Sequence, residues 1–177
     1  MLDWKNNRPK KYYEKCVEMF GEPTALASEK YGFAIWKTRG LFEEHILRDE
    51  DIKHCVPAPH HDYFYSSVKF FVSPNKVWDV LKITGSLTYD GLKKTLTARC
   101  GGIGANIATI YLAMLVANDL IKIGDVKKSK MYSLLIRAEI MSHEDMKKEM
   151  IEMKKENGRK FKKQLKLEYA PYADKKC

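Results

Sequence analysis

The stretch VWDVLKITGSLTYDGLKKTLTARCGGIGANIATIYLAMLVANDLIKIGDVKKSKMYSLLI, residues Val77 to Ile136, carries the pattern that predicts the fold. Its apolar residues recur at helical spacing between glycine-containing breaks, which predicts three helices, and two short apolar runs after them predict a β-hairpin. Three helices followed by a hairpin form the winged-helix arrangement. Domains of that shape bind DNA, bind proteins or serve as spacers, so the stretch predicts an architecture without deciding an activity.

Two helices are expected in the first half of this stretch. The first runs over residues 74–83, because a proline suits the first position of a helix and a Thr-Gly-Ser break follows. The second begins near Thr88 or Asp90, whose side chains can cap free N–H groups. Leu92 and Leu96 are expected to supply its buried face, and a glycine-rich break ends it.

The third helix is expected over residues 105–118 and is apolar almost all round. Residues three and four apart form its strongest stripe: Ile107, Ile110, Tyr111, Met114 and Leu115. Residues 120–123 and 131–136 are then expected to pair as the hairpin, with residues 124–130 as the wing tip. Three basic residues stand at that tip: Lys127, Lys128 and Lys130.

The part of the chain before this stretch is expected to mix helix and strand. Helical spacing predicts a helix over residues 9–20. Two runs split by Thr-Arg-Gly, residues 33–37 and 41–47, predict a hairpin with its glycine in the turn. Residues 49–62 are polar and rich in proline and histidine, which favours a loop. Residues 63–72, YFYSSVKFFV, are rich in aromatic and β-branched side chains and predict a strand.

The C-terminal part is expected to be helical. Ser142 and Asp145 resemble a capping box that opens a charged helix ending near Glu156, where Asn157 and Gly158 predict a stop. The residues after it form either a short second helix or a tail that is ordered only against a partner. The chain is thus expected to have an N-terminal helical arm over residues 1–30, a single α+β domain over 31–140 containing the winged-helix-like module 74–137, and a basic helical tail over 141–177.

The positive charge is concentrated in the last third of the chain. The 32 Lys and Arg residues outnumber the 23 Asp and Glu residues, which gives a net charge of +9. Residues 1–125 hold 17 basic and 15 acidic residues, whereas residues 126–177 hold 15 and 8, a net charge of +7. Contact with nucleic acid or another anionic partner is therefore expected through the wing tip and the tail. The candidate residues are Lys127, Lys128, Lys130, Arg159, Lys160, Lys162 and Lys163.

The third helix lacks what a DNA-reading helix needs. Groove reading uses Arg, Lys, Asn or Gln, and phosphate neutralisation needs positive charge, but residues 100–118 contain no charged residue. This segment approaches the length of a membrane span, yet its glycines and asparagines favour a buried core helix. Apolar and aromatic side chains that are candidates for a protein interface are Tyr111, Met114, Trp36 and Phe161.

A cluster of candidate metal ligands lies in HCVPAPHHD, residues 54–62, since His, Cys and Asp can all bind zinc. Cys55, His60 and His61 are the candidates. Their spacing matches no established ligand pattern, and the two prolines stiffen a loop without any metal. The preferred interpretation is an ordered loop with hydrogen-bonding histidines, so no metal and no cofactor are expected.

No enzyme activity is expected from the sequence, because no nucleophile, base and orienting group occur together at recognisable spacing. The segment GGIGANI after residue 100 lacks the third glycine and the preceding strand of a dinucleotide-binding loop. The four cysteines, at positions 16, 55, 100 and 177, show no pairing pattern, which favours free thiols in a reducing compartment. The N-terminal residues lack the apolar core of a secretory signal.

Three segments resemble a protein family encoded by large double-stranded DNA viruses of algae and amoebae, the chlorovirus type among them. They are LFEEHILRDE at residues 41–50, CVPAPHHDYFY at 55–65 and ITGSLTYDGLKKTLTARC at 83–100, and the resemblance extends over residues 30–125. That family has no known catalytic motif, so no active-site residue follows from it.

The resemblance implies a structural virion protein, a minor capsid component that cements or lines the capsid shell through protein–protein contacts. It implies other capsid proteins, major and minor, as partners, with the inner viral membrane surface or packaged DNA as further partners of the basic tail. The expected location is the virion, after synthesis in the host cytoplasm. The alternative hypothesis is a winged-helix DNA-binding protein that contacts nucleic acid through the wing and the tail.

Overall fold

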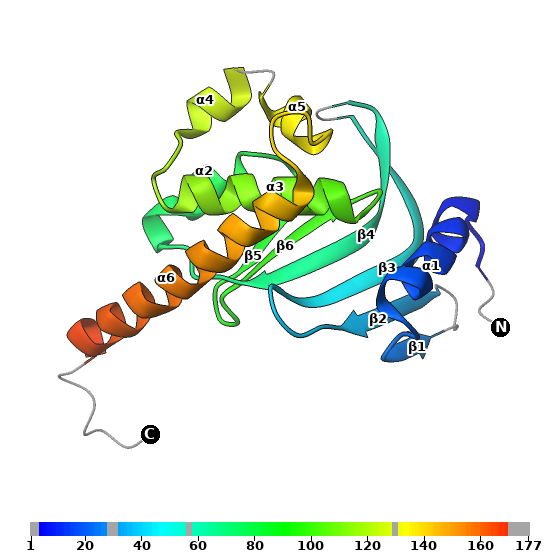
Figure 1. Cartoon of the computed structure of the whole chain (residues 1–177), viewed down its shortest axis with the longest axis horizontal. Helices are drawn as coiled ribbons and strands as arrows, with labels where there is room; N and C mark the ends of the chain where they lie inside the picture. The colour runs from blue at the N-terminus through cyan, green and yellow to red at the C-terminus, as the bar shows by residue number, and fades with distance from the viewer. Residues whose placement is uncertain (1–3, 28–31, 56–57, 129–130, 170–177) are drawn as a thin grey trace.

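The computed structural model describes residues 4–27, 32–55, 58–128 and 131–169 (Figure 1). They form a mixed α+β fold, as the sequence predicts, built on a six-stranded antiparallel sheet. The strands are β1 Ala25–Ala27, β2 Phe33–Lys37, β3 Phe42–His54, β4 His60–Lys69, β5 Leu87–Asp90 and β6 Thr95–Cys100. The helices are α1 Asn7–Phe20, α2 Val77–Leu81, α3 Ile103–Ala117, α4 Ile123–Lys128, α5 Met131–Ile136 and α6 His143–Tyr169, with the short 3-10 helix η1 Pro74–Lys76 before α2.

The sheet has the strand order β1-β2-β3-β4-β6-β5, and each neighbouring pair is antiparallel. Its centre is the long hairpin of β3 and β4, which pairs β2 on one side and β6 on the other. The register of this hairpin shifts between Phe42 and Glu44 and again between Leu47 and Ile52. Such irregularities bend a strand pair, and Figure 1 shows the end of the hairpin curving toward α5.

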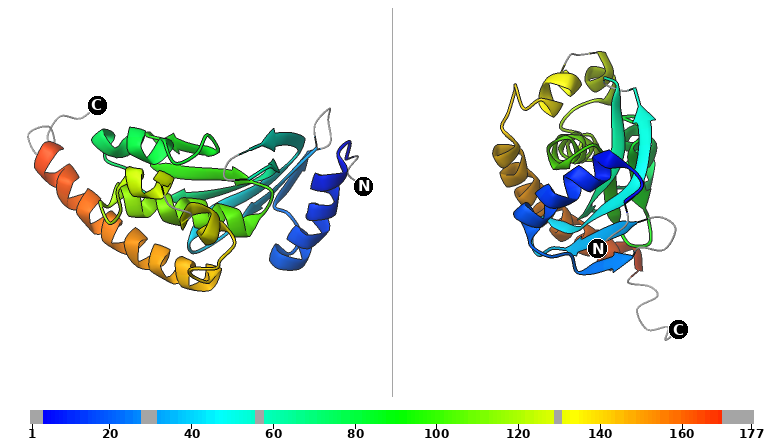
Figure 2. Two further views of the ribbon diagram at one scale, coloured as in Figure 1. Left: turned by 90° about the horizontal axis from the view of Figure 1, so that it is seen from above. Right: turned by 90° about the vertical axis from the view of Figure 1, so that its right-hand side faces the viewer.

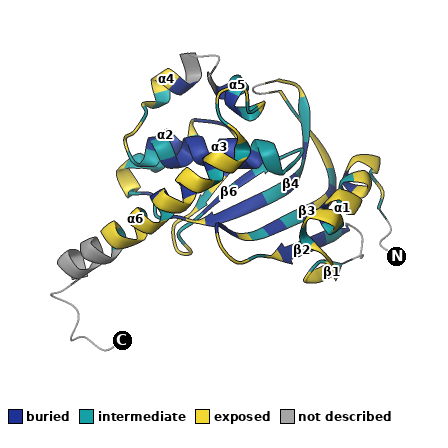
Figure 3. Ribbon diagram, viewed as in Figure 1, coloured by how far each residue is buried: buried dark blue, intermediate teal, exposed yellow. Residues whose placement is uncertain are grey.

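Helix α3 lies against one face of the sheet, and α6 packs on the side of α3 that faces away from the sheet (Figure 2). Because α3 is covered on two sides, most of it is buried (Figure 3). This confirms the prediction of a buried core helix. Among the described residues, no helix combines the length and the apolar character that crossing a bilayer requires. The largest hydrophobic cluster joins α3 to β4, β6 and α6, and its fully buried members include Val68, Leu96, Ile110, Leu112, Met114, Met146 and Met150.

Polar side chains also cross the interior, between α3 and the sheet. The Asn106 side-chain amide donates hydrogen bonds to the carbonyl oxygen of Phe64 at 3.1 Å and to Ser66 Oγ at 2.9 Å. Ser66 Oγ lies 3.0 Å from Nδ1 of His45, whose ring is stacked between those of Phe20 and Phe64. Burial lowers the pKa of His45 to about 4, so this imidazole is neutral at physiological pH.

The prediction of a second helix within the winged-helix arrangement is wrong, because β5 and β6 form a hairpin over residues 87–100. Leu96 and Ala98 are buried and alternate with more exposed threonines, which is the period of a strand, and β6 pairs with β4 along its length. Asp90 Oδ1 accepts hydrogen bonds from the N–H groups of Leu92 and Lys93 and so shapes the turn. Leu92 lies at that turn and is 95% exposed instead of buried.

The predicted wing is also wrong. Residues 120–123 and 131–136 do not pair as strands, and α4 and α5 form in this region. Val126, Tyr132 and Leu135 are buried in the cluster around α3, and the spacing of three between the last two suits one side of a helix. The winged-helix-like module over residues 74–137 is therefore not formed.

Two further boundaries differ from the prediction. The expected loop over residues 49–62 belongs largely to β3 and β4, since cross-strand pairing continues to His54 opposite His60. The expected helix stop at Asn157 is absent, and α6 continues to Tyr169, because the Asn157 side chain binds the backbone N–H and carbonyl of Phe71 instead of ending the helix.

Other elements confirm the sequence pattern. The N-terminal helix, the hairpin of β2 and β3, the strand β4, the first helix after Ser73 and the helix α3 all lie where the sequence predicts them, with ends shifted by a few residues. Ser142 Oγ accepts a hydrogen bond from the N–H of Asp145 at 3.1 Å, so the predicted cap of α6 is also confirmed.

Candidate metal centre

Three metal-ligating side chains gather at the end of the β3–β4 hairpin. His54 is the last residue of β3, His60 is the first of β4, and the two are paired directly across the strands. Asp62 follows two residues after His60, so it lies on the same side of β4. One ligand atom of each residue lies within 4.8 Å of the other two.

The facing atoms of this cluster are close enough to share one ion. Nδ1 of His54 lies 3.3 Å from Nε2 of His60 and 3.5 Å from Oδ2 of Asp62, and Nε2 of His60 lies 3.1 Å from Oδ1 of Asp62. Zinc bonds of about 2.0–2.1 Å in a tetrahedron separate neighbouring ligand atoms by roughly 3.3 Å.

One ring nitrogen of His60 is oriented toward the centre of the cluster by a backbone contact of the other. Nδ1 of His60 lies 2.6 Å from the carbonyl oxygen of Ala58, and a carbonyl can only accept, so Nδ1 carries a proton and donates it there. Nε2, on the other side of the ring, faces Oδ1 of Asp62. A backbone contact of this kind commonly orients a metal-binding histidine.

The two oxygens of Asp62 have different surroundings. Oδ2 accepts a hydrogen bond from Ser86 Oγ at 2.9 Å and another from Nε of Arg99 at 3.3 Å. Oδ1 has no hydrogen-bond partner among the described residues, although the side chain of Asp62 is fully buried. A buried carboxylate oxygen without a partner is costly, and a cation between Oδ1 and the imidazole nitrogens removes that cost.

The cluster is accessible from one side. The side chains of His54 and His60 are 22% and 24% exposed, whereas that of Asp62 is 0% exposed. His60 also lines a cavity of about 220 Å³ at the start of α3. The other lining residues are Ala58, Pro59, Cys100, Gly101, Gly102, Ala105 and Ile136. Burial raises the pKa of Cys100 to about 11, so its thiol is protonated at neutral pH.

The structure brings one of the three candidates from the sequence, Cys55, His60 and His61, into the cluster. His60 belongs to the cluster, but Cys55 is exposed outside it, and Nδ1 of His61 pairs with Asp51 at 2.7 Å instead. His54 and Asp62 were missed as ligands. The sequence pattern that could have found them is a histidine at each end of a short turn, with an aspartate two residues after the second histidine. This pattern brings three ligands together only if the two flanking segments pair as strands.

The other predicted contact residues are dispersed over the structure. Arg159 and Lys160 are exposed on α6. The backbones of Lys127 and Lys128 lie in α4 and those of Lys162 and Lys163 in α6, while their side chains and the whole of Lys130 lie outside the described residues.

The predicted interface side chains point largely into the protein. Trp36, Tyr111 and Met114 are buried inside the domain, so in this structure they do not offer their side chains to a partner. The ring of Phe161 packs against that of Phe71 with centroids 4.6 Å apart.

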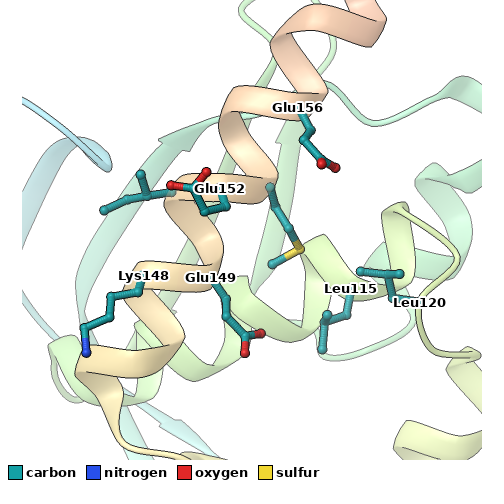
Figure 4. Close-up of a pocket in the computed structure, with 8 residues that line it drawn as sticks. Leu115, Leu120, Lys148, Glu149, Glu152 and Glu156 are labelled. Carbon is teal, nitrogen blue, oxygen red and sulfur yellow. The ribbon is translucent and has the colours of Figure 1, made fainter.

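A second cavity, of about 480 Å³, lies between α3 and α6 and is called the α3–α6 groove (Figure 4). Its apolar lining is Leu115, Leu120, Ile151 and Met153, and its polar lining is Lys148, Glu149, Glu152 and Glu156. Glu149 is held by the Tyr111 hydroxyl, which donates to it at 2.6 Å. The groove offers an apolar surface with acidic edges and brings no histidine or cysteine together.

Comparison of the chain with known protein families, with characterised proteins and with solved structures finds no match. The function of the chain must therefore be inferred from its own residues and their geometry.

Proposed function

We propose that the chain is a metal-binding protein that holds one zinc ion with Nδ1 of His54, Nε2 of His60 and Oδ1 of Asp62. The observation that carries this proposal is the buried Oδ1 of Asp62, which accepts no hydrogen bond among the described residues and lies 3.1 Å from Nε2 of His60. Two imidazoles and one carboxylate are ligands that zinc accepts.

The proposed role of the ion is to fasten the end of the β3–β4 hairpin to the rest of the domain. The three ligands come from the hairpin, while Ser86 and Arg99, which bind the carboxylate of Asp62, come from the residue before β5 and from β6. Outer contacts of this kind fix the orientation of a ligating carboxylate. The ion thereby links the turn of the hairpin, through Asp62, to the neighbouring strands.

Elemental analysis of the purified full-length chain tests this proposal. We expect one zinc per chain in the wild type and less than about a tenth of that in Asp62→Asn and His60→Ala, because a three-ligand site does not survive the loss of one ligand. His61→Ala is the matched control, since His61 is the neighbouring histidine but binds Asp51, and it should retain the zinc. A wild-type chain that takes up no zinc when the ion is added would refute the proposal.

As a second candidate function, we propose the structural virion role that the sequence resemblance implies. The α3–α6 groove supports it, because Leu120 and Ile151 remain 62% and 39% exposed beside the carboxylates of Glu149, Glu152 and Glu156. These features suit a segment of a neighbouring capsid protein that carries apolar side chains flanked by Lys or Arg.

Purified virus particles test the second candidate. The chain should be present in the shell of the particles, and Ile151→Glu should lower its incorporation, whereas Leu92→Ala at an exposed turn should leave it unchanged. Absence from the particles excludes this role. DNA binding by the basic tail predicts instead tight binding in a fluorescence titration that weakens steeply between two salt concentrations.

A further inference from the structure

The candidate zinc site has too few protein ligands to be closed. Structural zinc sites use four protein ligands, whereas sites with three keep a fourth position for water or another ligand. Among the described residues, the cluster contains only His54, His60 and Asp62. Ser86 Oγ is close, at 3.0 Å from Nδ1 of His54, but its hydroxyl is neutral and donates its proton to Asp62. None of the described side chains takes the fourth position, which leaves it open to a molecule from outside the chain.

The charges around that position favour an anion. A zinc ion carries two positive charges, and Asp62 is the one negative group of the cluster among the described residues. The guanidinium of Arg99, 3.3 Å from Oδ2 of Asp62, adds a further positive charge, while the two imidazoles bind the ion in their neutral form. The nearby acidic residues are engaged elsewhere, since Glu50 accepts a hydrogen bond from the Tyr65 hydroxyl and Asp51 pairs with Arg8 and His61. A bound anion reduces this excess of positive charge.

A cavity of suitable size adjoins the site. The cavity of about 220 Å³ shares His60 with the cluster and extends along Gly101, Gly102 and Ala105 at the start of α3. At that helix end the N–H groups of the first turn lack intrahelical acceptors and carry partial positive charge. The N–H of Ile103 is already used, because it donates to the Tyr12 hydroxyl at 2.8 Å, but Ala105 in the same turn faces the cavity.

The cavity also has an apolar part that limits what the anion can be. Ala58, Pro59, Ala105 and Ile136 contribute carbon surfaces, and the described lining residues include no Asp, Glu, Lys or Arg. At roughly 30 Å³ for each water molecule, the volume corresponds to about seven waters, which is the size of a small organic acid. A short-chain carboxylate matches both features, because its carboxylate group can bind the ion and its hydrocarbon chain can lie along these apolar residues.

We propose that the zinc site carries an exchangeable fourth ligand and that the chain binds a short-chain carboxylate there, with its carboxylate on the metal and its hydrocarbon part in the cavity beside Ala105 and Ile136. This inference rests on the proposed zinc site. It assigns a class of ligand to that site. The ion then both stabilises the end of the hairpin and binds the carboxylate.

Cobalt(II) substitution of the full-length chain tests the inference, because the visible absorption of cobalt reports its coordination. Acetate, propionate and butyrate should each change the spectrum in a saturable way, and their affinity should rise about fourfold with each added methylene group. Butanol, which has the chain but not the charge, should have no effect. Ala105→Leu fills the cavity and should weaken butyrate binding at least about tenfold relative to acetate. Leu92→Ala should bind like the wild type.

The outcomes separate the two proposals. A chain that binds no cobalt overturns the metal site and the carboxylate site together. A chain that binds cobalt with a spectrum that no carboxylate alters overturns only the exchangeable carboxylate ligand and leaves the metal site of the proposed function in place. Equal affinity for acetate and butyrate, or no loss of butyrate binding in Ala105→Leu, overturns the placement of the hydrocarbon part in the cavity.

Discussion

Nε2 of His60 lies 3.1 Å from Oδ1 of Asp62, a buried carboxylate oxygen that accepts no hydrogen bond from the described residues. Nδ1 of His60 donates to the carbonyl oxygen of Ala58, so Nε2 is the ring nitrogen that faces Asp62, beside Nδ1 of His54. A buried carboxylate oxygen without a hydrogen bond is unfavourable, and a cation beside it removes that cost. This contact couples the stability of the hairpin end to a bound ion.

Zinc should raise the melting temperature of the chain. An ion that binds the folded chain and not the unfolded one adds about 4 kcal/mol at a free concentration a thousand times the dissociation constant, which corresponds to roughly 10 °C for a domain of this size. Differential scanning calorimetry with zinc and with a chelator measures the shift. Asp62→Asn should lose the shift and His61→Ala should keep it, whereas an equal shift in both variants would indicate binding elsewhere.

Acid should destabilise the fold through His45. Burial lowers the pKa of His45 from 6.5 to about 4, so the folded chain takes up this proton at lower pH than the unfolded chain does. Stability is therefore highest above the unfolded pKa and falls as the pH drops toward the folded pKa. Between about pH 7 and about pH 5 the loss is about 2 kcal/mol.

Urea unfolding at both pH values, with a chelator present, measures this loss. His45→Phe keeps an aromatic ring against Phe20 and Phe64 but cannot titrate. Between the two pH values, the free energy of unfolding of this variant should therefore fall by about 2 kcal/mol less than that of the wild type. Because the other titrating groups are common to both chains, the same pH dependence in the variant and the wild type would contradict the assignment to His45.

Leu96 and Leu92 should differ sharply in their contribution to stability. Leu96 is fully buried between the sheet and α3, whereas Leu92 is 95% exposed at the turn before β6. Leu96→Ala should lower the free energy of unfolding by about 2–5 kcal/mol, and Leu92→Ala should change it by less than about 0.5 kcal/mol. Urea unfolding measures both values. Similar losses of stability from the two substitutions would favour the helix that the sequence predicts, with Leu92 and Leu96 both buried, over the hairpin of β5 and β6.

The described cysteines should react with iodoacetamide in a fixed order. Cys55 is exposed, whereas burial raises the pKa of Cys16 to about 12 and that of Cys100 to about 11. Because the thiolate is the reacting form, Cys55 should be labelled at least about a hundred times faster than the other two at neutral pH. Mass spectrometry of the labelled peptides measures the rates, with urea-unfolded chain as the control in which they should converge. Fast labelling of Cys100 in the folded chain would contradict its raised pKa.

The sequence determined the elements whose pattern is local. Helical periodicity placed α1 and α3, and the uncharged residues 100–118 indicated a helix buried in the core. Aromatic and β-branched residues placed β4, and Ser142 marked the start of α6. The α+β class follows from these elements.

Tertiary pairing decided the rest, because it acts between segments that are distant in sequence. Residues 95–100 became β6 because β4 offers an unpaired edge, and residues 131–136 became a helix because Tyr132 and Leu135 pack on α3. The metal cluster was hidden for the same reason. His54, His60 and Asp62 are visible in the sequence as separate candidate ligands, but only the register of β3 against β4 brings their ligand atoms within 4.8 Å of one another.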